Sequence, residues 1–399
     1  MINIVLPELW LLVLIVGLPQ LSETVYTPAL PDIAHSLGVS DAWVEYTLTI
    51  YLFGFAVGTL LWGKLSDRFG RKPCMLLGLA TYIIGCIGCY FSGSITTLMI
   101  SRFIQAFGGS TGSVLGQAIC RDAFHGSERG KVFSTIGSAL AFSPAVGPVI
   151  GGLIDQTFGW PSIFIFLITF GILVFGATLF RLPETLVAQN STQETLWTLM
   201  HRMARDTRLI GFALLVAGCN GIGFSYYAEG SFYLIDLLGL SPAVYGLTFL
   251  GIAAAGMTGG YLSRRLHDTN DSHTILGWGI WIVGIVSSLF MISAFALLGY
   301  NAPKIAFIIL TIASMIGIFL GIGIMIPNAL SLSLEDYRSS IGTASALFGF
   351  VYYCLISALT LGMGLIHNGT LVPMPVYFCI IAIAMIVIFK ACVPARVEV

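Results

Sequence analysis

Stretches of about 20 apolar residues recur along this chain, and they limit its fold more than any other feature of the sequence. A helix needs roughly 20 apolar residues to cross the hydrocarbon core of a bilayer. Only 9% of the 399 residues are Asp, Glu, Lys or Arg, and the mean hydropathy is +0.92. A soluble domain carries about 25% charged residues. The sequence therefore predicts an all-α membrane protein with twelve transmembrane helices. Their approximate positions are 6–30, 43–63, 73–92, 98–120, 131–154, 160–181, 208–235, 243–264, 273–297, 303–333, 340–366 and 373–393.

One long polar segment divides these stretches into six and six. We expect a six-helix bundle at residues 1–181, a cytoplasmic linker at 182–207 and a second, pseudo-symmetric six-helix bundle at 208–399. The part of the linker that reads TQETLWTLMHRMARD has a weakly amphipathic helical pattern. It is expected to lie along the membrane surface.

Lys and Arg gather in alternate links between the spans. If the N-terminus is cytoplasmic, sixteen of the eighteen cations fall on the cytoplasmic side. The other two are Lys304, in an outer link, and Arg102, inside a span. Cytoplasmic links of membrane proteins carry an excess of Lys and Arg. The sequence thus predicts a multi-pass protein with both termini in the cytoplasm.

The composition gives no support to several other classes of protein. The net charge of −1 provides no basic surface for nucleic acid. The eight cysteines are scattered, and no second pair or nearby histidine completes a site with Cys86 and Cys89. We expect packed or lipid-facing thiols, and no metal or other cofactor. A membrane enzyme would need a cluster of His, Asp or Cys, or a phosphate-binding loop. A sensor would need an appended soluble domain. The sequence offers none of these.

Five short motifs carry a family resemblance. GKLSDRFGRK, residues 63–72, concentrates four cations and one acid between two apolar stretches, and it resembles the signature loop of the major facilitator superfamily. RFIQAFGGS at Arg102–Ser110 resembles the span-4 motif of that superfamily. SPAVGPVIGGLI at Ser143–Ile154 is similar to the span-5 motif of its antiporters. YTPALPDIA at Tyr26–Ala34 and GTASAL at Gly342–Leu347 narrow the likeness to the Bcr/CflA-type branch of drug:proton antiporters.

This resemblance implies a function. It implies proton-coupled export of small molecules, drugs or amphipathic metabolites, across the bacterial inner membrane by alternating access of the two bundles. The expected partners are a small-molecule substrate, protons and the lipid bilayer, and the chain is expected to act as a monomer. Two alternatives on the same fold stay open: a siderophore or other metabolite exporter, and a proton-coupled importer.

The charged link at residues 63–72 has two interpretations. Its cations satisfy the inside-positive bias, but this does not explain the acid among them. The resemblance implies a conformational lock, in which Asp67 binds the cytoplasmic start of span 11 when that side is closed, because a helix N-terminus favours an anion. The residues assigned to the lock are Gly63, Asp67, Arg68, Gly70, Arg71 and Arg121.

Charged residues inside apolar spans are costly to bury and are candidates for function. Glu23 in span 1, Glu229 in span 7 and Arg102 in span 4 are such residues. Spans 1 and 7 are equivalent in the two halves of this superfamily. The resemblance therefore implies that both glutamates face a central cavity and exchange protons for substrate, assisted by Arg102. The branch usually has Asp at the position of Thr24. The alternatives are helix-end acids at the membrane interface and an arginine that reaches the outer surface. All six histidines fall in links or at span ends, so histidine is not expected to carry the proton.

Span 5 combines two prolines with three glycines. Proline removes a helix hydrogen bond and bends the helix. The glycines are predicted to pack closely against span 8. The resemblance implies a kinked gate that prevents leakage, and kinking without a special function is the alternative. The gate residues are Pro144, Gly147, Pro148, Gly151 and Gly152.

Polar and aromatic residues on spans that line the cavity in this superfamily are the candidates for substrate binding. Aromatic faces suit lipophilic cations, but tyrosine near a helix end also belongs to the interface belt. The candidates are Tyr26, Tyr51, Gln117, Asn220, Tyr226, Tyr227, Tyr233, Asn328 and Tyr352.

Overall fold

The computed structural model describes residues 6–124, 126–186 and 196–394. In these residues the regular secondary structure is helical and there is no strand. The chain forms two compact units, Met1–Thr192 and Gln193–Val399. The division falls within the segment assigned to the linker, and residues 187–195 of that linker lie outside the described residues.

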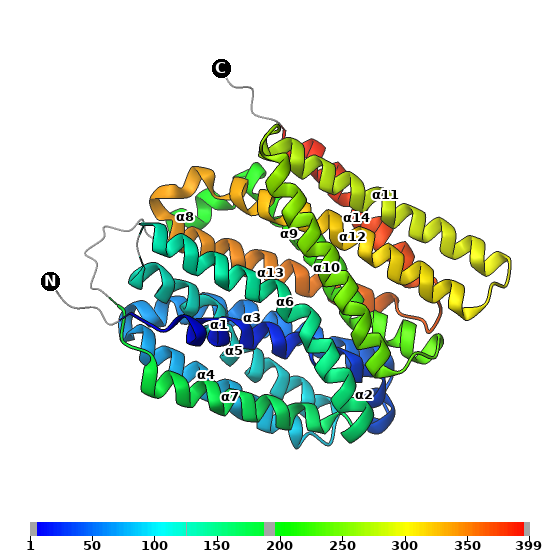
Figure 1. Cartoon of the computed structure of the whole chain (residues 1–399), viewed down its shortest axis with the longest axis horizontal. Coiled ribbons are helices and arrows are strands. Elements are labelled where there is room, and N and C mark those ends of the chain that lie inside the picture. Colours follow the sequence, from blue (N-terminus) through cyan, green and yellow to red (C-terminus); the bar gives the residue numbers. More distant parts are fainter. Residues whose placement is uncertain (1–5, 125, 187–195, 395–399) are drawn as a thin grey trace. The chain divides into compact units, whose positions relative to one another are not determined.

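Unit 1 holds the helices drawn from blue to green in Figure 1. They are α1 (Leu9–Thr24), the 3-10 helix η1 (Thr27–Ala29), α2 (Leu30–Leu37), α3 (Asp41–Phe69), α4 (Arg71–Tyr90), α5 (Ile95–Ala123), α6 (Gly126–Phe158) and α7 (Pro161–Arg181).

Unit 2 continues from green to red in the same figure. Its elements are α8 (Leu196–Met203), α9 (Thr207–Ser231), the π-helix η2 (Phe232–Leu237), α10 (Pro242–Leu266), α11 (Ser272–Gly299), α12 (Lys304–Ser333), the 3-10 helix η3 (Glu335–Ser340), α13 (Ile341–Ile366) and α14 (Pro373–Cys392).

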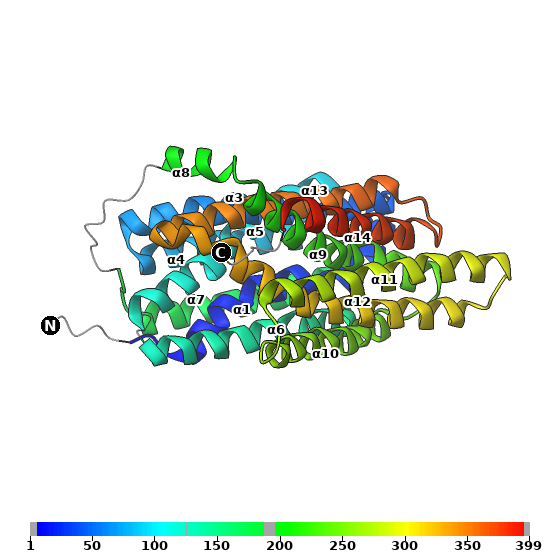
Figure 2. The same ribbon diagram turned by 90° about the horizontal axis from the view of Figure 1, so that it is seen from above.

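The two units repeat one pattern of helix pairs. In unit 1, α5 packs against α3 and α4, α4 packs against α7, and α1 packs against α6 and α5. In unit 2, α12 packs against α10 and α11, α11 packs against α14, and α9 packs against α13 and α12. Figure 2 shows the pair α11 and α12 side by side. The six long helices of one unit thus match the six of the other in order, which confirms the predicted fold of two related bundles.

Every predicted span is recovered as a long helical segment among the described residues. Ten of these helices are long and apolar enough to cross a membrane. The remaining two, α5 and α6, have 29 and 33 residues but contain many Gly, Ser and Thr residues. The first span is longer than predicted, because α1, η1 and α2 together run from Leu9 to Leu37. Pro28 and Pro31 start the next turns at N1 or N2, where proline is tolerated.

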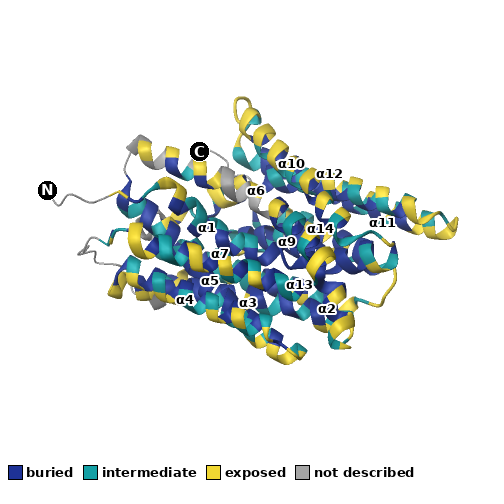
Figure 3. Ribbon diagram, turned by 60° about the horizontal axis from the view of Figure 1, so that its bottom comes forward, coloured by how far each residue is buried: buried dark blue, intermediate teal, exposed yellow. Residues whose placement is uncertain are grey.

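Many large apolar side chains of the bundles are exposed. Figure 3 marks exposed positions along α11 and α12. On α11 the exposed residues follow at intervals of three or four, so they share one face: Trp278, Trp281, Ile285, Leu289, Ile292 and Phe295. A soluble monomer rarely exposes so continuous an apolar surface. This face therefore fits a lipid environment.

Side-chain caps begin several of the helices. Ser94 and Thr97 form a capping box at the start of α5. At the start of α11, Asp271 accepts hydrogen bonds from the Thr274 hydroxyl and from the amides of His273 and Thr274, and the bond from the Thr274 hydroxyl is the main cause that lowers the pKa of Asp271. Asp206 caps α9 in the same way, through the amides of Arg208 and Leu209.

The linker helix α8 and the residues just after it contact the segment before α13. The Tyr337 hydroxyl of η3 donates a 2.9 Å hydrogen bond to Asp206, and the Arg202 guanidinium of α8 lies 4.7 Å from the Tyr337 ring centre. The C-terminal part of the linker therefore belongs to unit 2.

Candidate functional site

Arg102 of α5 is completely buried, so its side chain does not reach solvent. Its guanidinium carbon lies 4.3 Å from the ring centre of Tyr26 and 4.2 Å from that of Tyr51. Nη1 donates a 2.7 Å hydrogen bond to Gln105, whereas Nε and Nη2 have no hydrogen-bond partner. A desolvated cation–π contact contributes about 2 kcal/mol. Two tyrosines assigned to substrate binding thus hold this arginine in unit 1.

Hydrogen bonds position these two tyrosines. The Tyr26 hydroxyl lies 2.9 Å from the Thr47 hydroxyl of α3. The Tyr51 hydroxyl, also from α3, donates a 3.3 Å hydrogen bond to the Pro19 carbonyl of α1. The arginine site therefore joins α1, α3 and α5.

Glu23 near the end of α1 is the acid of this site. It is only 2% exposed, and its Oε2 has no hydrogen-bond partner. Arg102 is close enough to act on it electrostatically. Thr24, the next residue, faces α6 at Gly147, and its hydroxyl bonds to the Gln20 carbonyl of its own helix. In this chain the buried carboxylate of α1 therefore comes from position 23, and position 24 is used for helix packing.

Gln105 extends the site to α4. Its Nε2 donates to Cys86 Sγ at 3.1 Å, and Cys89 Sγ lies 3.9 Å from its Oε1. Both cysteines are buried, and all eight cysteines of the chain are free thiols. Cys86 and Cys89 are thus packed thiols, one of the two expected arrangements.

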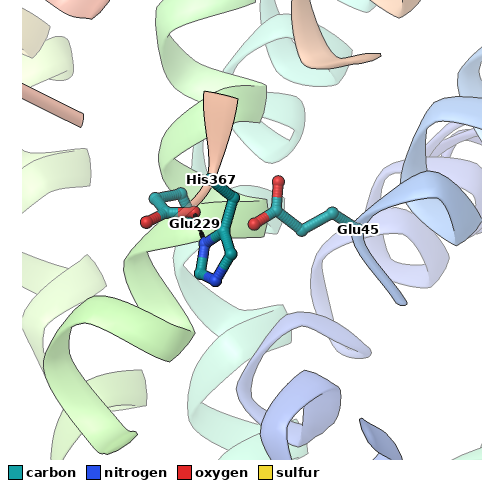
Figure 4. A group of neighbouring side chains, drawn as sticks. All are labelled: Glu45, Glu229 and His367. Atoms are coloured by element: carbon teal, nitrogen blue, oxygen red, sulfur yellow. Dashed lines mark hydrogen bonds and ion pairs between the residues drawn. The ribbon is translucent and has the colours of Figure 1, made fainter. Parts of the chain in front are cut away.

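Glu229 near the end of α9 is the corresponding acid of unit 2. Its side chain is 1% exposed, and Oε2 lies 2.7 Å from Nδ1 of His367, the residue directly after α13 (Figure 4). Its Oε1 has no hydrogen-bond partner. The π-helix η2 follows immediately and carries Tyr233, whose hydroxyl is also buried without a partner. π-Helical turns are frequent at functional sites.

His367 is mostly buried although it stands at a helix end, and the sequence assigned it no role. All histidines were set aside because they stand in links or at span ends, and His367 does stand at the end of α13. Its side chain is nevertheless only 9% exposed and is paired with a candidate proton-coupling acid. Position at a helix end does not exclude burial, because the end of one helix can pack against the middle of another.

The charged link between α3 and α4 is organised by Arg71. Its guanidinium bonds to Asp67 at 2.6 Å, to Asp122 of α5 at 2.8 Å and to the Ser66 hydroxyl at 2.7 Å. The Arg71 side chain is 9% exposed, whereas that of Asp67 is 62% exposed. Within unit 1 the partner of Asp67 is therefore Arg71, and the acid that is mostly enclosed with this arginine is Asp122.

Glu184, just after α7, caps the start of α4. Its carboxylate accepts hydrogen bonds from the backbone amides of Arg71 at 2.9 Å and Lys72 at 3.1 Å. Burial acts to raise the pKa of Glu184, but hydrogen bonds from four backbone amides outweigh it and lower the pKa. Gly70 has φ +100°, and a β-carbon there would lie 2.7 Å from Glu184 Oε2. Glycine is thus required at position 70 both by backbone conformation and by the cap.

The other residues assigned to the lock lie around this cluster. Arg68 is exposed and stacks over Phe69, with 5.3 Å from guanidinium carbon to ring centre. Arg121 donates to the Gln117 carbonyl at 3.3 Å, and Gly63 faces Val114 of α5. The structure brings Asp67, Gly70 and Arg71 together.

We expect Asp67→Asn to stop transport while the protein stays folded. The variant removes the charge of an acid that is 62% exposed and keeps an oxygen that can accept from Arg71, so it should cost at most about 1 kcal/mol of folding free energy. Any large loss of transport must then come from a conformational role. Transport in vesicles and the thermal unfolding midpoint in detergent test this. Asp122→Asn is the contrast, because it removes the negative charge enclosed with the mostly buried Arg71 guanidinium and should lower the unfolding midpoint. Normal turnover by Asp67→Asn would contradict the lock.

The glycines of α6 pack against α1. A β-carbon at Gly147 would overlap the Thr24 side chain, and one at Gly151 would overlap the Val25 carbonyl. Packing of these glycines against span 8, α10, would join the two units and stays a prediction. Within unit 2, the small residues of α10 face α12, where a β-carbon at Gly259 would lie 3.1 Å from the Gly323 α-carbon. Both contacts form within a unit, because small residues let neighbouring helices of one bundle approach.

The backbone of α6 is one helix through both prolines, from Gly126 to Phe158. Pro148 is buried, and the side chain of Pro144 lies outside the described residues. The gate role assigned to this run stays a prediction.

The remaining substrate candidates divide by environment. Asn328 bonds to Ser263 of α10 at 2.8 Å, so it joins two helices. Tyr226 is buried against Tyr245 and Phe249, and Tyr227 also contacts Phe249. Gln117 is exposed, and Asn220 and Tyr352 are half-buried. Tyr352 stacks on Tyr353 with ring centres 4.7 Å apart.

Sequence reasoning missed three residues of these clusters, His367, Glu184 and Asp122, and it also missed the buried acid Glu45. Glu45 is a completely buried acid on α3, and it stands two residues inside the predicted span 43–63. That placement alone was a usable signal. For Glu184 and Asp122 no comparable signal exists, because their partners are 113 and 51 residues away in the chain.

The comparisons agree with this architecture. A family model described as Major Facilitator Superfamily matches residues 12–361. An uncharacterized transporter of Rickettsia bellii is 34% identical over 94% of each chain. A chloramphenicol resistance protein of Pseudomonas aeruginosa is 30% identical over 94% of this chain and 88% of its own. A bicyclomycin resistance protein homolog of Haemophilus influenzae is 28% identical over 85% of this chain and 84% of its own.

Among solved structures, a partially occluded inward-open form of the xylose transporter XylE from E. coli matches 98% of each chain, with a TM-score of 0.74 and 14% identity. This likeness concerns the fold. The relatives confirm the resemblance to the Bcr/CflA-type branch that the motifs indicated. The chain belongs to the major facilitator superfamily, and it is a transporter and not an enzyme.

Proposed function

We propose that this chain exports small drug-like molecules, cationic or amphipathic, across the bacterial inner membrane in exchange for protons. One observation carries the proposal. Each unit contains a buried carboxylate with an oxygen that lacks a hydrogen-bond partner, Glu23 in unit 1 and Glu229 in unit 2. An ionised carboxylate in such surroundings costs several kcal/mol unless a proton or a cation neutralises it. A proton and a substrate therefore compete for each acid.

The relatives support the substrate class. Two of them are named for resistance to bicyclomycin and to chloramphenicol. Arg102, fixed between two tyrosines, supplies a permanent positive charge beside Glu23. When substrate replaces the proton, this charge stabilises the ionised acid.

The proposed cycle is alternating access. The bundles at residues 1–181 and 208–399 rock about the linker, Asp67 locks the closed cytoplasmic side, and the glycine face of α6 limits leakage. The placement of sixteen of eighteen cations supports cytoplasmic termini. A monomer suffices for this cycle, because both acids belong to one chain.

Inside-out membrane vesicles with an imposed pH gradient test the function. Chloramphenicol, bicyclomycin and ethidium are added in turn, and a pH-sensitive dye follows the gradient. We expect at least one compound to collapse the gradient. Glu23→Gln and Glu229→Gln should each abolish the response, because glutamine cannot exchange a proton. Glu128→Gln, an exposed acid of α6, is the matched control and should respond normally.

Two results would contradict the proposal. A response that survives in both glutamine variants would place proton exchange elsewhere. Substrate-driven gradient collapse only in right-side-out vesicles would reverse the direction and indicate import.

A further inference from the structure

An open hollow with a volume of about 610 Å³ lies in unit 2, between the linker helix α8 and η3. Sites for small molecules have volumes of about 300–1,000 Å³. Asp206, Asp336 and Tyr337 contribute to the lining. The lining also includes a stripe of side chains at intervals of three or four residues along α8 and the turn that follows it: Thr198, His201, Arg202 and Arg205. All of these lining residues belong to unit 2.

Packing fixes the direction of this polar stripe. Leu199 and Met203 stand one turn apart on the same helix and are only 1% and 8% exposed. The helix packs against α13. The backbone amide of Arg205 donates to the Arg202 carbonyl at 3.2 Å, so the helical turn continues to the last residue of the stripe. The stripe therefore stays at the hollow, because turning it away would expose two buried apolar side chains.

Both acids of the hollow already bind donors or a cation of unit 2. One oxygen of Asp206 accepts hydrogen bonds from the amides of Arg208 and Leu209, each at 3.0 Å, and the other accepts from the Tyr337 hydroxyl at 2.9 Å. Asp336 lies 3.7 Å from the Arg208 guanidinium. These donors and this cation offset the negative charge of the two carboxylates.

The stripe on α8 carries positive charge and no acid. Arg202 stacks over Tyr337, with 4.7 Å from the guanidinium carbon to the ring centre. The side chains of His201 and Arg205 are exposed, and neither makes a hydrogen bond or ion pair with another residue that the structure describes. One helical turn separates them, so the two side chains are neighbours. One anion in the hollow can therefore bind both.

Phosphate suits this set of donors. A guanidinium can donate two parallel N–H groups to phosphate oxygens, an imidazole N–H adds a third hydrogen bond, and the Thr198 hydroxyl stands one turn before His201.

Exposed apolar side chains next to the stripe favour a lipid as the source of this phosphate. Met200, which precedes His201, is 40% exposed, and Ile210, near the start of α9, is 39% exposed. A helix that combines cations with exposed apolar side chains is typical of segments that lie in the headgroup layer of a membrane.

We propose that this hollow binds the phosphate group of an acidic phospholipid from the cytoplasmic leaflet, with Arg205 and His201 as its ligands and Arg202 as a fixed neighbouring charge. The inference rests on the proposed cytoplasmic placement of the linker and not on proton coupling. A headgroup held here binds α8 next to the bond between Asp206 and Tyr337. It therefore strengthens the attachment of the linker to η3.

Native mass spectrometry of the full-length protein in detergent tests the site. Phosphatidylglycerol, which has a net negative charge, and phosphatidylcholine, which has none, are titrated separately. We expect the wild type to prefer phosphatidylglycerol by about fivefold or more. Arg205→Gln should weaken phosphatidylglycerol binding by about fivefold, the usual contribution of one basic residue at an acidic lipid surface, and should leave phosphatidylcholine binding unchanged.

Arg264→Gln is the matched control. Arg264 is an exposed cation near the end of α10 and is not part of the hollow. Detergent offers no charged membrane surface to attract it, so this variant should bind phosphatidylglycerol as the wild type does.

Two further measurements separate a free phosphate from a lipid, and a binding defect from a folding defect. Inorganic phosphate in about hundredfold excess should not displace phosphatidylglycerol, because it lacks the acyl chains that contact apolar side chains. Without lipid, Arg205→Gln should have the unfolding midpoint of the wild type, because the side chain is exposed. Added phosphatidylglycerol should raise the midpoint of the wild type more than that of the variant.

The inference is overturned if the wild type binds both lipids alike, if Arg205→Gln keeps the full preference, or if Arg264→Gln loses it equally. Complete displacement by inorganic phosphate would assign the hollow to free phosphate and would also overturn it. Absence of any substrate response in vesicles would instead refute the proposed export, and the lipid titration would still decide the binding site.

Discussion

Gly151→Leu is expected to be among the most destabilising single substitutions in unit 1. A β-carbon at this position overlaps the Val25 carbonyl oxygen, which is backbone and cannot rotate away. Ordinary overpacking costs about 1–3 kcal/mol, and here α1 and α6 must move apart as whole helices. That movement would also disturb Glu23 at the end of α1. We therefore expect a loss beyond this range and little monodisperse protein in detergent.

The matched control is Gly176→Leu on α7, where nothing lies within 4 Å of the added β-carbon. Thermal unfolding followed by size-exclusion chromatography compares the two. If the midpoint of Gly151→Leu lay within about 3 °C of the control, a difference near 1 kcal/mol, the close contact of α6 with α1 would be refuted.

Arg102→Gln is expected to reduce proton-driven transport by about 100-fold or more. The change removes two cation–π contacts and the positive charge that acts on buried Glu23. Breaking a buried charge interaction by removing one partner costs about 3–5 kcal/mol, and each 1.36 kcal/mol is a factor of ten in rate. Arg102→Lys should recover little, because an ammonium lacks the planar group that stacks between the two tyrosines.

A double variant separates transport from stability. Arg102→Gln alone should also lower the unfolding midpoint, since it leaves the Glu23 carboxylate without its neighbouring cation. Adding Glu23→Gln should restore part of the lost stability without restoring transport. If the double variant were as unstable as the sum of the two single variants, Glu23 and Arg102 would act independently.

Much of the fold was predictable because a bilayer permits few kinds of spanning structure. Apolar stretches of membrane length and the placement of cations locate the helices, and α5 and α6 were found through the polar residues that bound them. The extension of the first span through Pro28 and Pro31 was not found, because a proline that ends one turn also starts the next.

The candidate site was only partly predictable. Glu23, Glu229 and Arg102 stand out in the sequence because charge is rare inside apolar stretches. Their partners do not. Tyr26 and Tyr51 look like substrate or interface residues until the Arg102 guanidinium is seen between them. The same holds for His367, which is 138 residues from Glu229 in the chain. Such pairs are decided by tertiary packing, which local patterns do not encode.

The free cysteines have a practical consequence. The four in unit 1 are all buried, and only Cys354 and Cys392 in unit 2 are partly accessible. Buried thiols react poorly with maleimides. Replacing just these two would leave a chemically silent background, into which one surface cysteine per unit could be introduced. Spin labels or fluorophores at such positions would then report the separation of the two halves as substrate and pH are varied.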